Sequence, residues 1–236
     1  MGYPERITPS DTSPGILALH LARYVFAQQW CADRDVLDVG CGAGYGTFRL
    51  SVVARTVVGG DVSEEALEYA RSHYGAPNLD FRVLDAMKLA FGDGSFDTVC
   101  SFETIEHVDD PEALVREVAR VLRPEGTFVV STPHVARTTH APANPHHRVE
   151  FAREDFERVL RESFASVEMY GEHRVETRRH EVLRRLDVLG LRRRSPLLRR
   201  ASALTGTPAT EDVTLQDVEI SQKGVESARV LVAVCT

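Results

Sequence analysis

Apolar and polar positions follow two different periods along this chain, and the two periods predict strands and helices in turn. Short, β-branched apolar runs that are bounded by turn residues indicate buried strands. Such runs lie at 36–39, 56–60, 79–84, 96–101, 127–131, 166–170 and 227–235. Apolar residues at helical spacing predict helices at 14–30, 45–53, 64–74, 111–122 and 154–161. This alternation of strands and helices favours a single α/β domain.

The composition narrows the class of protein. A length of 236 residues fits one α/β domain, and an apolar content of 43% can fill its core. The longest apolar runs are too short to span a bilayer, and the first residues lack the apolar segment of a signal peptide. Four scattered cysteines without metal-ligand spacing favour reduced thiols and a cytoplasmic location. A net charge of −7 argues against a nucleic-acid-binding protein.

Three alternating glycines, Gly40, Gly42 and Gly44, follow the strand at 36–39. Glycine permits positive φ in a tight turn and lets a ligand approach the bare backbone. Free N–H groups at the start of the next helix add a polar site. The dinucleotide-binding fingerprint needs glycine at its first, third and sixth positions, and here the sixth position is another residue in both registers. The turn therefore predicts a nucleotide-type cofactor that is not a dinucleotide.

Asp61 ends the second predicted strand and lies 21 residues after Gly40. An acidic residue at about this spacing reaches the ribose hydroxyls of a bound nucleotide. A carboxylate suits this position because it can accept hydrogen bonds from both hydroxyls at once. Asp61 is not needed as a helix cap, since Ser63 already supplies one. We therefore expect Asp61 to bind the ribose.

The stretch Asp38-x-Gly40-x-Gly42-x-Gly44 resembles the first motif of the class I S-adenosylmethionine-dependent methyltransferases. The sequence Glu-His-Val at 106–108, after the fourth predicted strand, resembles one large small-molecule group of that family. Together the two motifs carry the resemblance, which covers residues 30–151 well and the rest of the chain loosely.

A third segment, Asn-Pro-His-His-Arg-Val-Glu-Phe at 144–151, resembles a segment of the same group. His147, Glu150 and Phe151 align with that group's pattern. The Arg and Val are exchanged relative to the pattern, and His146 stands where an aromatic residue is usual. No role is therefore carried over to the arginine.

The resemblance implies a doubly wound, mostly parallel seven-stranded sheet of the Rossmann-like methyltransferase type, with S-adenosylmethionine as cofactor and S-adenosylhomocysteine as product. It places Asp38 and the glycines near the amino-acid end of the cofactor, Asp85 and Ala86 at the adenine, and residues 101–103 on the floor of the site. The expected cofactor-binding residues are Asp38, Gly40, Cys41, Gly42, Gly44, Asp61, Val62, Asp85, Ala86, Met87, Ser101, Phe102 and Glu103.

A methyltransferase can also need a base that removes a proton from the acceptor. His107 is the first candidate because it follows the fourth strand, and an imidazole suits proton removal at neutral pH. His147, with Glu150 to orient it, is the second, and His134 is the third. The expected substrate-binding residues are His20, Tyr24, Glu106, His146 and Glu150. The loop histidines lack a fixed metal-ligand spacing, so we predict no metal site.

Three segments lie outside the α/β core. Residues 1–30 contain a predicted cap helix, and 132–150 form a predicted substrate loop because long loops within a domain are usually functional. Residues 173–213 form an Arg-rich helical insertion, 173–205, followed by a small, polar and mobile stretch. The insertion is expected to pack on this domain or on a second subunit, to contact anionic lipid through 184–200, or to bind an acidic substrate or partner. Both a monomer and a homodimer are consistent with this pattern.

The predicted activity is S-adenosylmethionine-dependent methylation of an oxygen or nitrogen atom of a small polar metabolite, with a sugar or aminocyclitol of secondary metabolism as the expected class. The acidic residues and histidines at the site favour a polyhydroxylated or amino substrate. One alternative is methylation of a lipid, quinone or other apolar natural product at a membrane surface. Another is a non-catalytic cofactor-binding module. A short-chain reductase would need Tyr-x-x-x-Lys, which this sequence lacks.

Overall fold

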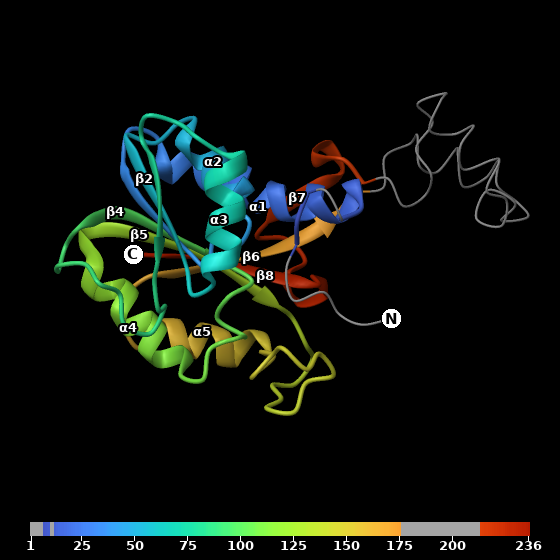
Figure 1. The fold of residues 1–236 in the computed structure, drawn as a ribbon. Coiled ribbons are helices and arrows are strands. Elements are labelled where there is room, and N and C mark those ends of the chain that lie inside the picture. The colour runs from blue at the N-terminus through green and yellow to red at the C-terminus, as the bar shows by residue number, and fades with distance from the viewer. Residues whose placement is uncertain (1–6, 10–11, 176–212) are drawn as a thin grey trace, which may run out of the picture.

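The computed structural model describes residues 7–9, 12–175 and 213–236, which form a single eight-stranded sheet with helices on both faces (Figure 1). The strand order is β3-β2-β1-β4-β5-β8-β6-β7. The strands are β1 (Asp35–Val39), β2 (Thr56–Asp61), β3 (Leu79–Val83), β4 (Phe96–Phe102), β5 (Leu122–Pro133), β6 (Val167–Arg174), β7 (Val218–Ser221) and β8 (Val230–Cys235).

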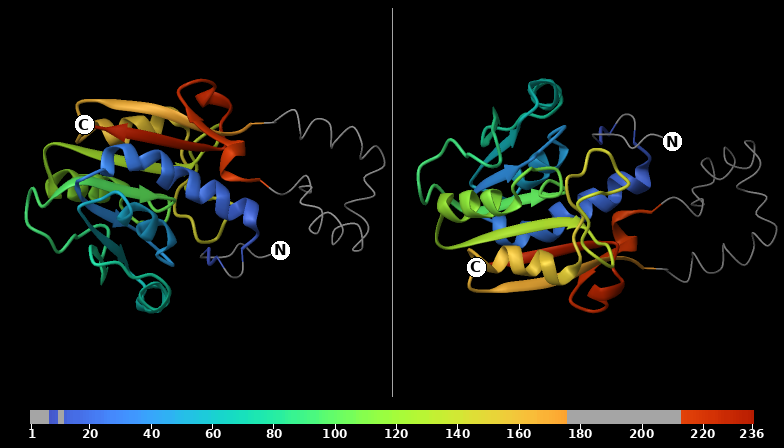
Figure 2. Two further views of the ribbon diagram at one scale, coloured as in Figure 1. Left: turned by 90° about the horizontal axis from the view of Figure 1, so that it is seen from above. Right: turned by 90° about the horizontal axis from the view of Figure 1, so that it is seen from below.

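Helices α1, α2 and α3 cover one face of the sheet, and α4 and α5 cover the other (Figures 1 and 2). Their bounds are α1 (Pro14–Cys31), α2 (Tyr45–Ser51), α3 (Glu64–His73), α4 (Pro111–Val121) and α5 (Arg153–Arg161). Ser63 caps α3 by accepting from the Ala66 N–H, and Asp110 caps α4 in the same way. These caps fix where each helix starts, and with it the path of the loop that precedes it.

The first five strands run parallel, whereas β8 pairs antiparallel with both β5 and β6. The chain starts in the middle of the sheet at β1, moves outward through β2 and β3, and then returns to β4 on the other side of β1. The crossover direction therefore changes between β1 and β4. Open α/β sheets bind ligands at the carboxyl ends of the strands beside such a point.

The core lies on both faces of the sheet because successive side chains of a strand point to opposite sides. In β1, Leu37 and Val39 join the cluster under α4 and α5, together with Phe128. Val36 points the other way and packs with Ala27 of α1. All five side chains are almost completely buried, which explains why Val36, Leu37 and Val39 of β1 are apolar on both faces of the strand.

The predicted doubly wound, mostly parallel α/β fold and the N-terminal helix are confirmed, with one correction. The sheet has eight strands and not seven, because the short strand β7 adds to the edge of β6. Its four residues are too few to show a period in the sequence. The predicted helical insertion at 173–213 falls almost entirely on 176–212, outside the described residues. Its first two residues, 173–174, belong to strand β6 and not to a helix.

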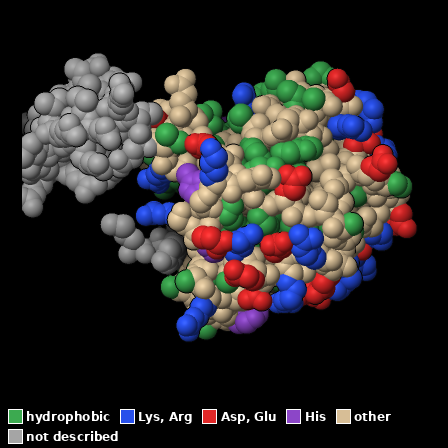
Figure 3. Space-filling view, turned by 180° about the vertical axis from the view of Figure 1, so that it is seen from behind, with side chains coloured by type: hydrophobic (Ala, Val, Ile, Leu, Met, Phe, Trp, Pro, Cys, Tyr) green, Lys and Arg blue, Asp and Glu red, His purple; other side chains and the backbone are tan. Residues whose placement is uncertain are grey.

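Acidic and basic side chains are interspersed over the face of the molecule that Figure 3 presents. Exposed ion pairs of the described chain include Arg71 with Glu64 and Arg82 with Asp80. Exposed pairs of this kind contribute little to stability. None of the helices in the described part of the chain is long and apolar enough to cross a membrane.

Candidate functional site

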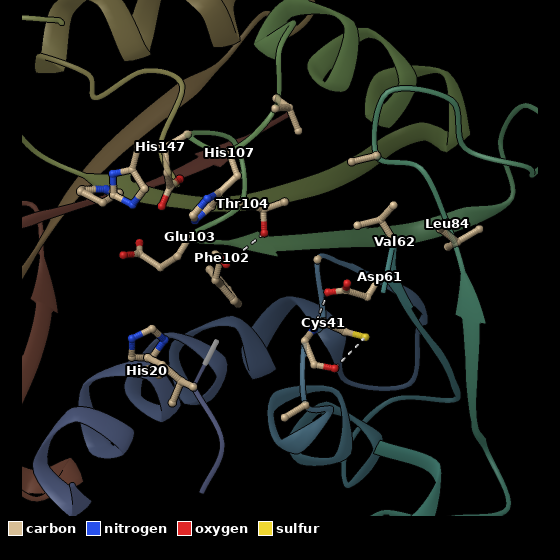
Figure 4. Close-up of a pocket in the computed structure, with 18 of the residues that line it drawn as sticks. His20, Cys41, Asp61, Val62, Leu84, Phe102, Glu103, Thr104, His107 and His147 are labelled. Carbon is tan, nitrogen blue, oxygen red and sulfur yellow. Dashed lines mark hydrogen bonds between the residues drawn. The ribbon is translucent and has the colours of Figure 1, made fainter. Parts of the chain in front are cut away.

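A cavity of about 530 Å³ lies at the carboxyl ends of β1 to β4, next to the point where the crossover direction changes (Figure 4). The loops that follow these four strands form most of its wall, and α1 and the loop at 132–150 close the remaining sides. The volume is in the usual range for small-molecule and cofactor sites. The cavity is therefore the candidate active site.

Most of the residues predicted from the sequence line this cavity. They are His20, Tyr24, Gly40, Cys41, Gly42, Asp61, Val62, Asp85, Ala86, Met87, Phe102, Glu103, Glu106, His107 and His147. The cavity wall, as far as the described chain forms it, leaves out Asp38, Gly44, Ser101, His134, His146 and Glu150. For these residues the structure shows other positions, given below.

The glycine turn has the backbone conformation that the sequence predicts. Gly40, Gly42 and Gly44 have φ values of 75°, 52° and 80°, which side chains rarely allow. A Cβ atom on Gly40 would also lie 2.2 Å from Oγ1 of Thr104, so the turn packs directly on the loop after β4. A Cβ atom on Gly42 would meet no heavy atom of the described chain within 4 Å. Gly42 therefore offers bare backbone to a ligand in the cavity.

Two acidic residues are held at the rim by backbone N–H groups. Asp61 accepts from the N–H of Gly42 on one carboxylate oxygen and from the N–H of Ser63 on the other, both at 2.9 Å. Asp85 accepts from the N–H of Met87 at 2.8 Å. Each carboxylate oxygen has two lone pairs, so Asp61 keeps acceptor capacity for two further donors. Its orientation is fixed before any ligand arrives.

Asp38 lies behind the cavity wall and is fully buried. It accepts a hydrogen bond of 2.6 Å from Oγ1 of Thr47. Burial raises the pKa of Asp38 to about 7, although this hydrogen bond opposes the shift. Gly44 is the N-cap of α2, and Ser101 is buried within β4. These three residues, expected at the cofactor, instead support the turn and the floor from behind, because their side chains or backbone face the core.

The titration of Asp38 predicts how stability depends on pH. A carboxyl group whose pKa is raised by folding stabilises the native state below its unfolded pKa, and this contribution is lost as the pH rises through the folded value. We expect Asp38→Asn, which cannot titrate, to gain stability relative to the wild type by about 1.4 kcal/mol per pH unit between pH 4 and 7. Urea unfolding at several pH values measures this difference. Parallel profiles for the two proteins would contradict it, and the exposed Asp80→Asn serves as control.

The loop after β4 places two glutamates on the wall. Glu103 adopts a positive φ of 52°, which a non-glycine residue reaches only at a cost, and strain of this kind is often found at functional sites. Glu106 is fully buried, and one of its oxygens accepts from Oγ1 of Thr132 at 3.1 Å. Burial raises the pKa of Glu106 well above its usual range, and the nearby Glu103 adds to this effect.

His107 and His147 lie next to each other above Glu103 (Figure 4), with ring centroids 4.8 Å apart. The Nδ1 atom of His107 lies 2.9 Å from the carbonyl oxygen of His146. Because a carbonyl can only accept, Nδ1 carries the proton and Nε2 keeps its lone pair. Burial lowers the pKa of His107 below its ordinary value, and His147 adds to this effect, so the ring is neutral at pH 7. Nδ1 of His147 lies 2.8 Å from a carboxylate oxygen of Glu150.

Three residues of the loop therefore have positions that differ from the prediction. His146 supplies only its carbonyl, and Glu150 orients His147 without reaching the cavity wall. The side chain of His134 lies toward the segment just before β8, where its Nδ1 hydrogen-bonds with the carbonyl oxygen of Ala228 at 2.9 Å. The reason is that β5 stays paired with β8 up to Pro133, so the residue that follows lies beside the start of β8. We therefore do not retain His134 as a base.

Helix α1 closes the cavity opposite the histidines, with His20 across from Glu103 (Figure 4). Tyr24 packs edge-on against Phe102, with ring centroids 4.8 Å apart. A Cβ atom on Gly46 would lie 1.9 Å from the Tyr24 ring, so only glycine lets the helix approach α2 this closely. Burial lowers the pKa of His20 well below its usual value, and a neighbouring arginine adds to this. The neutral imidazole therefore forms part of the wall.

That arginine, Arg23, lies behind the cavity wall, and the sequence did not indicate its role there. It is buried, donates from Nε to Glu172 of β6 at 2.7 Å, and lies 3.4 Å from Glu103 through its terminal nitrogen. The pair ties α1 to the end of β6 and to the cavity floor. An arginine on an apolar helix is a weak signal, because its partner Glu172 lies 149 residues further along the chain.

Several residues of the cavity wall were not predicted from the sequence. Thr104 contacts the glycine turn, and Asn144 lies 2.8 Å from the Nε2 atom of His147 through its amide nitrogen. Asn144 begins the segment at 144–151 that the sequence analysis singled out, so its position was a usable signal. Further missed residues that line the cavity are Ile7, Ala43, Tyr45, Leu84, Val108, Asp109 and Pro133.

Comparisons with known proteins identify the family. Residues 37–130, which include the glycine turn, Asp61, Asp85 and the loop after β4, match the methyltransferase domain family. A protein of Mycolicibacterium smegmatis, named "Probable S-adenosylmethionine-dependent methyltransferase", is 36% identical over 186 residues, which is 71% of each chain. The chain belongs to the S-adenosylmethionine-dependent methyltransferases. The prediction of the family and of the cofactor is therefore confirmed.

Two further relatives of this methyltransferase are informative. The ubiquinone biosynthesis O-methyltransferase of Thiobacillus denitrificans is 38% identical over 113 residues, 47% of this chain and 49% of that protein. The chain thus spans only about half of that enzyme. The crystal structure of the YcgJ protein from Bacillus subtilis has a TM-score of 0.60 at 19% identity, and covers 91% of this chain and 97% of that one. This likeness shows the Rossmann-like fold.

The cavity of this methyltransferase fits S-adenosylmethionine. The bare backbone at Gly42 leaves room for a ligand beside the turn, and Asp61 retains free acceptor lone pairs at the rim. Asp85 lies further along the same rim, at the end of β3.

Proposed function

We propose that this methyltransferase transfers the methyl group of S-adenosylmethionine to an oxygen or nitrogen atom of a small polar metabolite, with a sugar or an aminocyclitol as the substrate class. The observation that carries the proposal is the polar wall of the cavity. It consists of Glu103, Glu106, His107 and His147, all next to one another beyond the glycine turn. Polar groups inside a cavity need partners, and a polyhydroxylated or amino substrate supplies them.

The cofactor roles follow from the positions on the rim. We assign the backbone of Gly40, Cys41 and Gly42 to the amino-acid end of the cofactor and Asp61 to the ribose hydroxyls. The adenine lies against Asp85, Ala86 and Met87, with Val62 over the rim and Phe102 and Glu103 as the floor. Val62 is 77% exposed, and an adenine ring above it would cover that surface.

The bound cofactor supplies an electrophilic methyl group on its sulfonium. The protein must hold the acceptor atom in line with the methyl carbon and the sulfur, about 3 Å from the carbon. His20 and Tyr24 of α1 exclude water from one side of the cavity, and the loop at 132–150 does so from the other. The lone pair on Nε2 of His107 is the group of the polar wall that is best placed to activate the acceptor, because its Nδ1 proton is already engaged.

A second substrate class, an apolar or quinone-like acceptor, is favoured by the similarity to the ubiquinone biosynthesis O-methyltransferase. In that case the Arg-rich segment at 184–200, which lies outside the described residues, would contact the membrane. A further alternative, a cofactor-binding module without catalysis, is disfavoured because the relatives are named as methyltransferases.

The two substrate classes can be separated with methyl-labelled S-adenosylmethionine, the purified protein and a deproteinised extract of the source cells. We expect the label in the aqueous fraction after partition between water and an organic solvent. Label in the organic fraction would support the apolar acceptor instead. Absence of transfer by a protein that binds the cofactor would contradict both. A reaction with Asp61→Ala provides the background in each fraction.

A further inference from the structure

Three side chains of metal-ligand type converge on the polar wall. Glu106 and His107 follow β4, whereas His147 comes from the loop at 132–150. Figure 4 labels the two histidines, which lie side by side. One ligand atom from each side chain lies within 4.8 Å of the other two. In a tetrahedral site, two ligand atoms at about 2.1 Å from a zinc ion are about 3.4 Å apart. Closing the cluster on an ion therefore requires side-chain shifts of less than about 1 Å.

Glu106 shows that the cluster lacks a partner. Its carboxylate is completely buried, and Thr132 engages only one of the two oxygens. The other oxygen, Oε1, has no hydrogen-bond partner among the described residues. Buried polar atoms almost always have partners, because leaving one unsatisfied is costly. A bound cation would satisfy this oxygen.

Both histidines are also oriented as metal ligands usually are. A metal-bound imidazole typically donates its other N–H to a carbonyl or carboxylate, which fixes the ring and its tautomer. Nδ1 of His107 engages the carbonyl of His146, and Nδ1 of His147 engages the carboxylate of Glu150. In each ring the Nε2 atom is therefore the nitrogen that could bind a metal ion. At His147 the amide nitrogen of Asn144 now contacts Nε2 at 2.8 Å, and this amide would have to rotate away.

We propose that Glu106, His107 and His147 form a binding site for a divalent transition-metal ion of the zinc class. Two imidazoles and one carboxylate suit zinc and its neighbours, whereas magnesium and calcium prefer oxygen ligands. Three protein ligands leave a position open, as in catalytic zinc sites. The sequence alone predicts no metal site, because His147 follows the adjacent pair Glu106-His107 by 40 residues, a spacing that matches no motif.

The role of the ion rests on the proposed methyl transfer, and it narrows the acceptor to a hydroxyl group. An oxygen in the open position becomes more acidic, and its proton leaves to solvent. The oxygen lone pair then forms the new bond to the methyl carbon while the carbon–sulfur bond breaks and its electron pair returns to sulfur. The products are a methyl ether and S-adenosylhomocysteine. When the metal ion is bound, His107 acts as one of its ligands and not as the base.

The test uses the full chain, stripped with a chelator and titrated with zinc chloride in a calorimeter. We expect one zinc ion per chain and a higher melting temperature when zinc is bound. Glu106→Gln and His147→Gln should bind zinc roughly a hundredfold more weakly or not at all. His140→Gln, an exposed histidine of the same loop, is the matched control and should bind like the wild type. The melting temperature of each stripped variant shows whether it is folded.

Weak zinc binding that is equal in all four proteins would overturn the proposal. The labelled methyl-transfer assay separates this failure from failure of the proposed function. Full activity of the stripped enzyme, together with no zinc binding, would overturn the metal site. It would still support the proposed methyl transfer, with His107 as its base. Stoichiometric zinc binding that depends on Glu106 and His147, without transfer to any acceptor, would support the site and contradict the proposed reaction.

Discussion

Replacing His107 by glutamine is expected to lower the turnover number for methyl transfer by about 10²–10⁴-fold, the usual contribution of a group that activates a nucleophile. The side chain lies on the cavity wall, and its Nδ1 proton is held by the carbonyl of His146. Glutamine is close to histidine in size and can donate to the same carbonyl, but its amide has no basic nitrogen that could accept a proton or bind a metal ion. The loss should therefore fall on turnover, while the affinity for S-adenosylmethionine changes little.

Initial rates with methyl-labelled cofactor, measured on the fraction that takes up the label, check this expectation. His73→Gln is the matched control, because His73 is exposed at the far end of α3 and contacts Ser72 and Tyr69 only on the surface. If the His107→Gln variant keeps more than a tenth of the wild-type turnover, His107 does not activate the acceptor. Unchanged melting temperatures would show that the effect is local.

Replacing Asp61 by alanine is expected to weaken S-adenosylhomocysteine binding by roughly 10²–10⁴-fold. Each hydrogen bond to a charged group contributes about 1.5–3 kcal/mol, and the carboxylate has acceptor capacity for both ribose hydroxyls. The same substitution also releases the N–H groups of Gly42 and Ser63, which now hold the turn and the start of α3. Asp61→Asn keeps one carbonyl oxygen as an acceptor, so its loss of affinity should be intermediate.

Isothermal titration with S-adenosylhomocysteine measures these affinities without any knowledge of the acceptor. Asp80→Ala is a suitable control, because Asp80 is exposed on the neighbouring strand β3 and pairs with Arg82 outside the cavity. If a folded Asp61→Ala protein binds S-adenosylhomocysteine with wild-type affinity, Asp61 does not bind the ribose. The binding experiment thus tests the cofactor geometry separately from the chemistry at His107.

Local patterns made the parallel part of the fold predictable. Buried strands of a parallel sheet show as short apolar runs, and helices are marked by caps such as Ser63 and Asp110. The glycine turn is also local, because a positive φ at Gly40, Gly42 and Gly44 depends on the residues of the turn itself. For this reason the family and the cofactor could be predicted from the amino-acid sequence.

The antiparallel edge and the polar wall were less predictable. The sequence contains no sign that β7 pairs with β6, since four residues show no clear period. His134 and His147 look equally suited to act on a substrate, yet the pairing of β5 with β8 turns His134 away. Arg23 and Glu172 form a buried pair that neither residue indicates by itself.

The sequence by itself determined the fold class and the glycine turn, because each depends on residues that are close together in the chain. It also predicts Asp61 as the residue that binds the ribose. The tertiary structure alone decided which polar side chains meet. Glu106, His107 and His147 converge because strand β4 and the loop after β5 end at the same edge of the sheet. Contacts of this kind depend on strand register and loop path, which consecutive residues do not encode. The candidate chemistry of this methyltransferase is therefore a property of its fold.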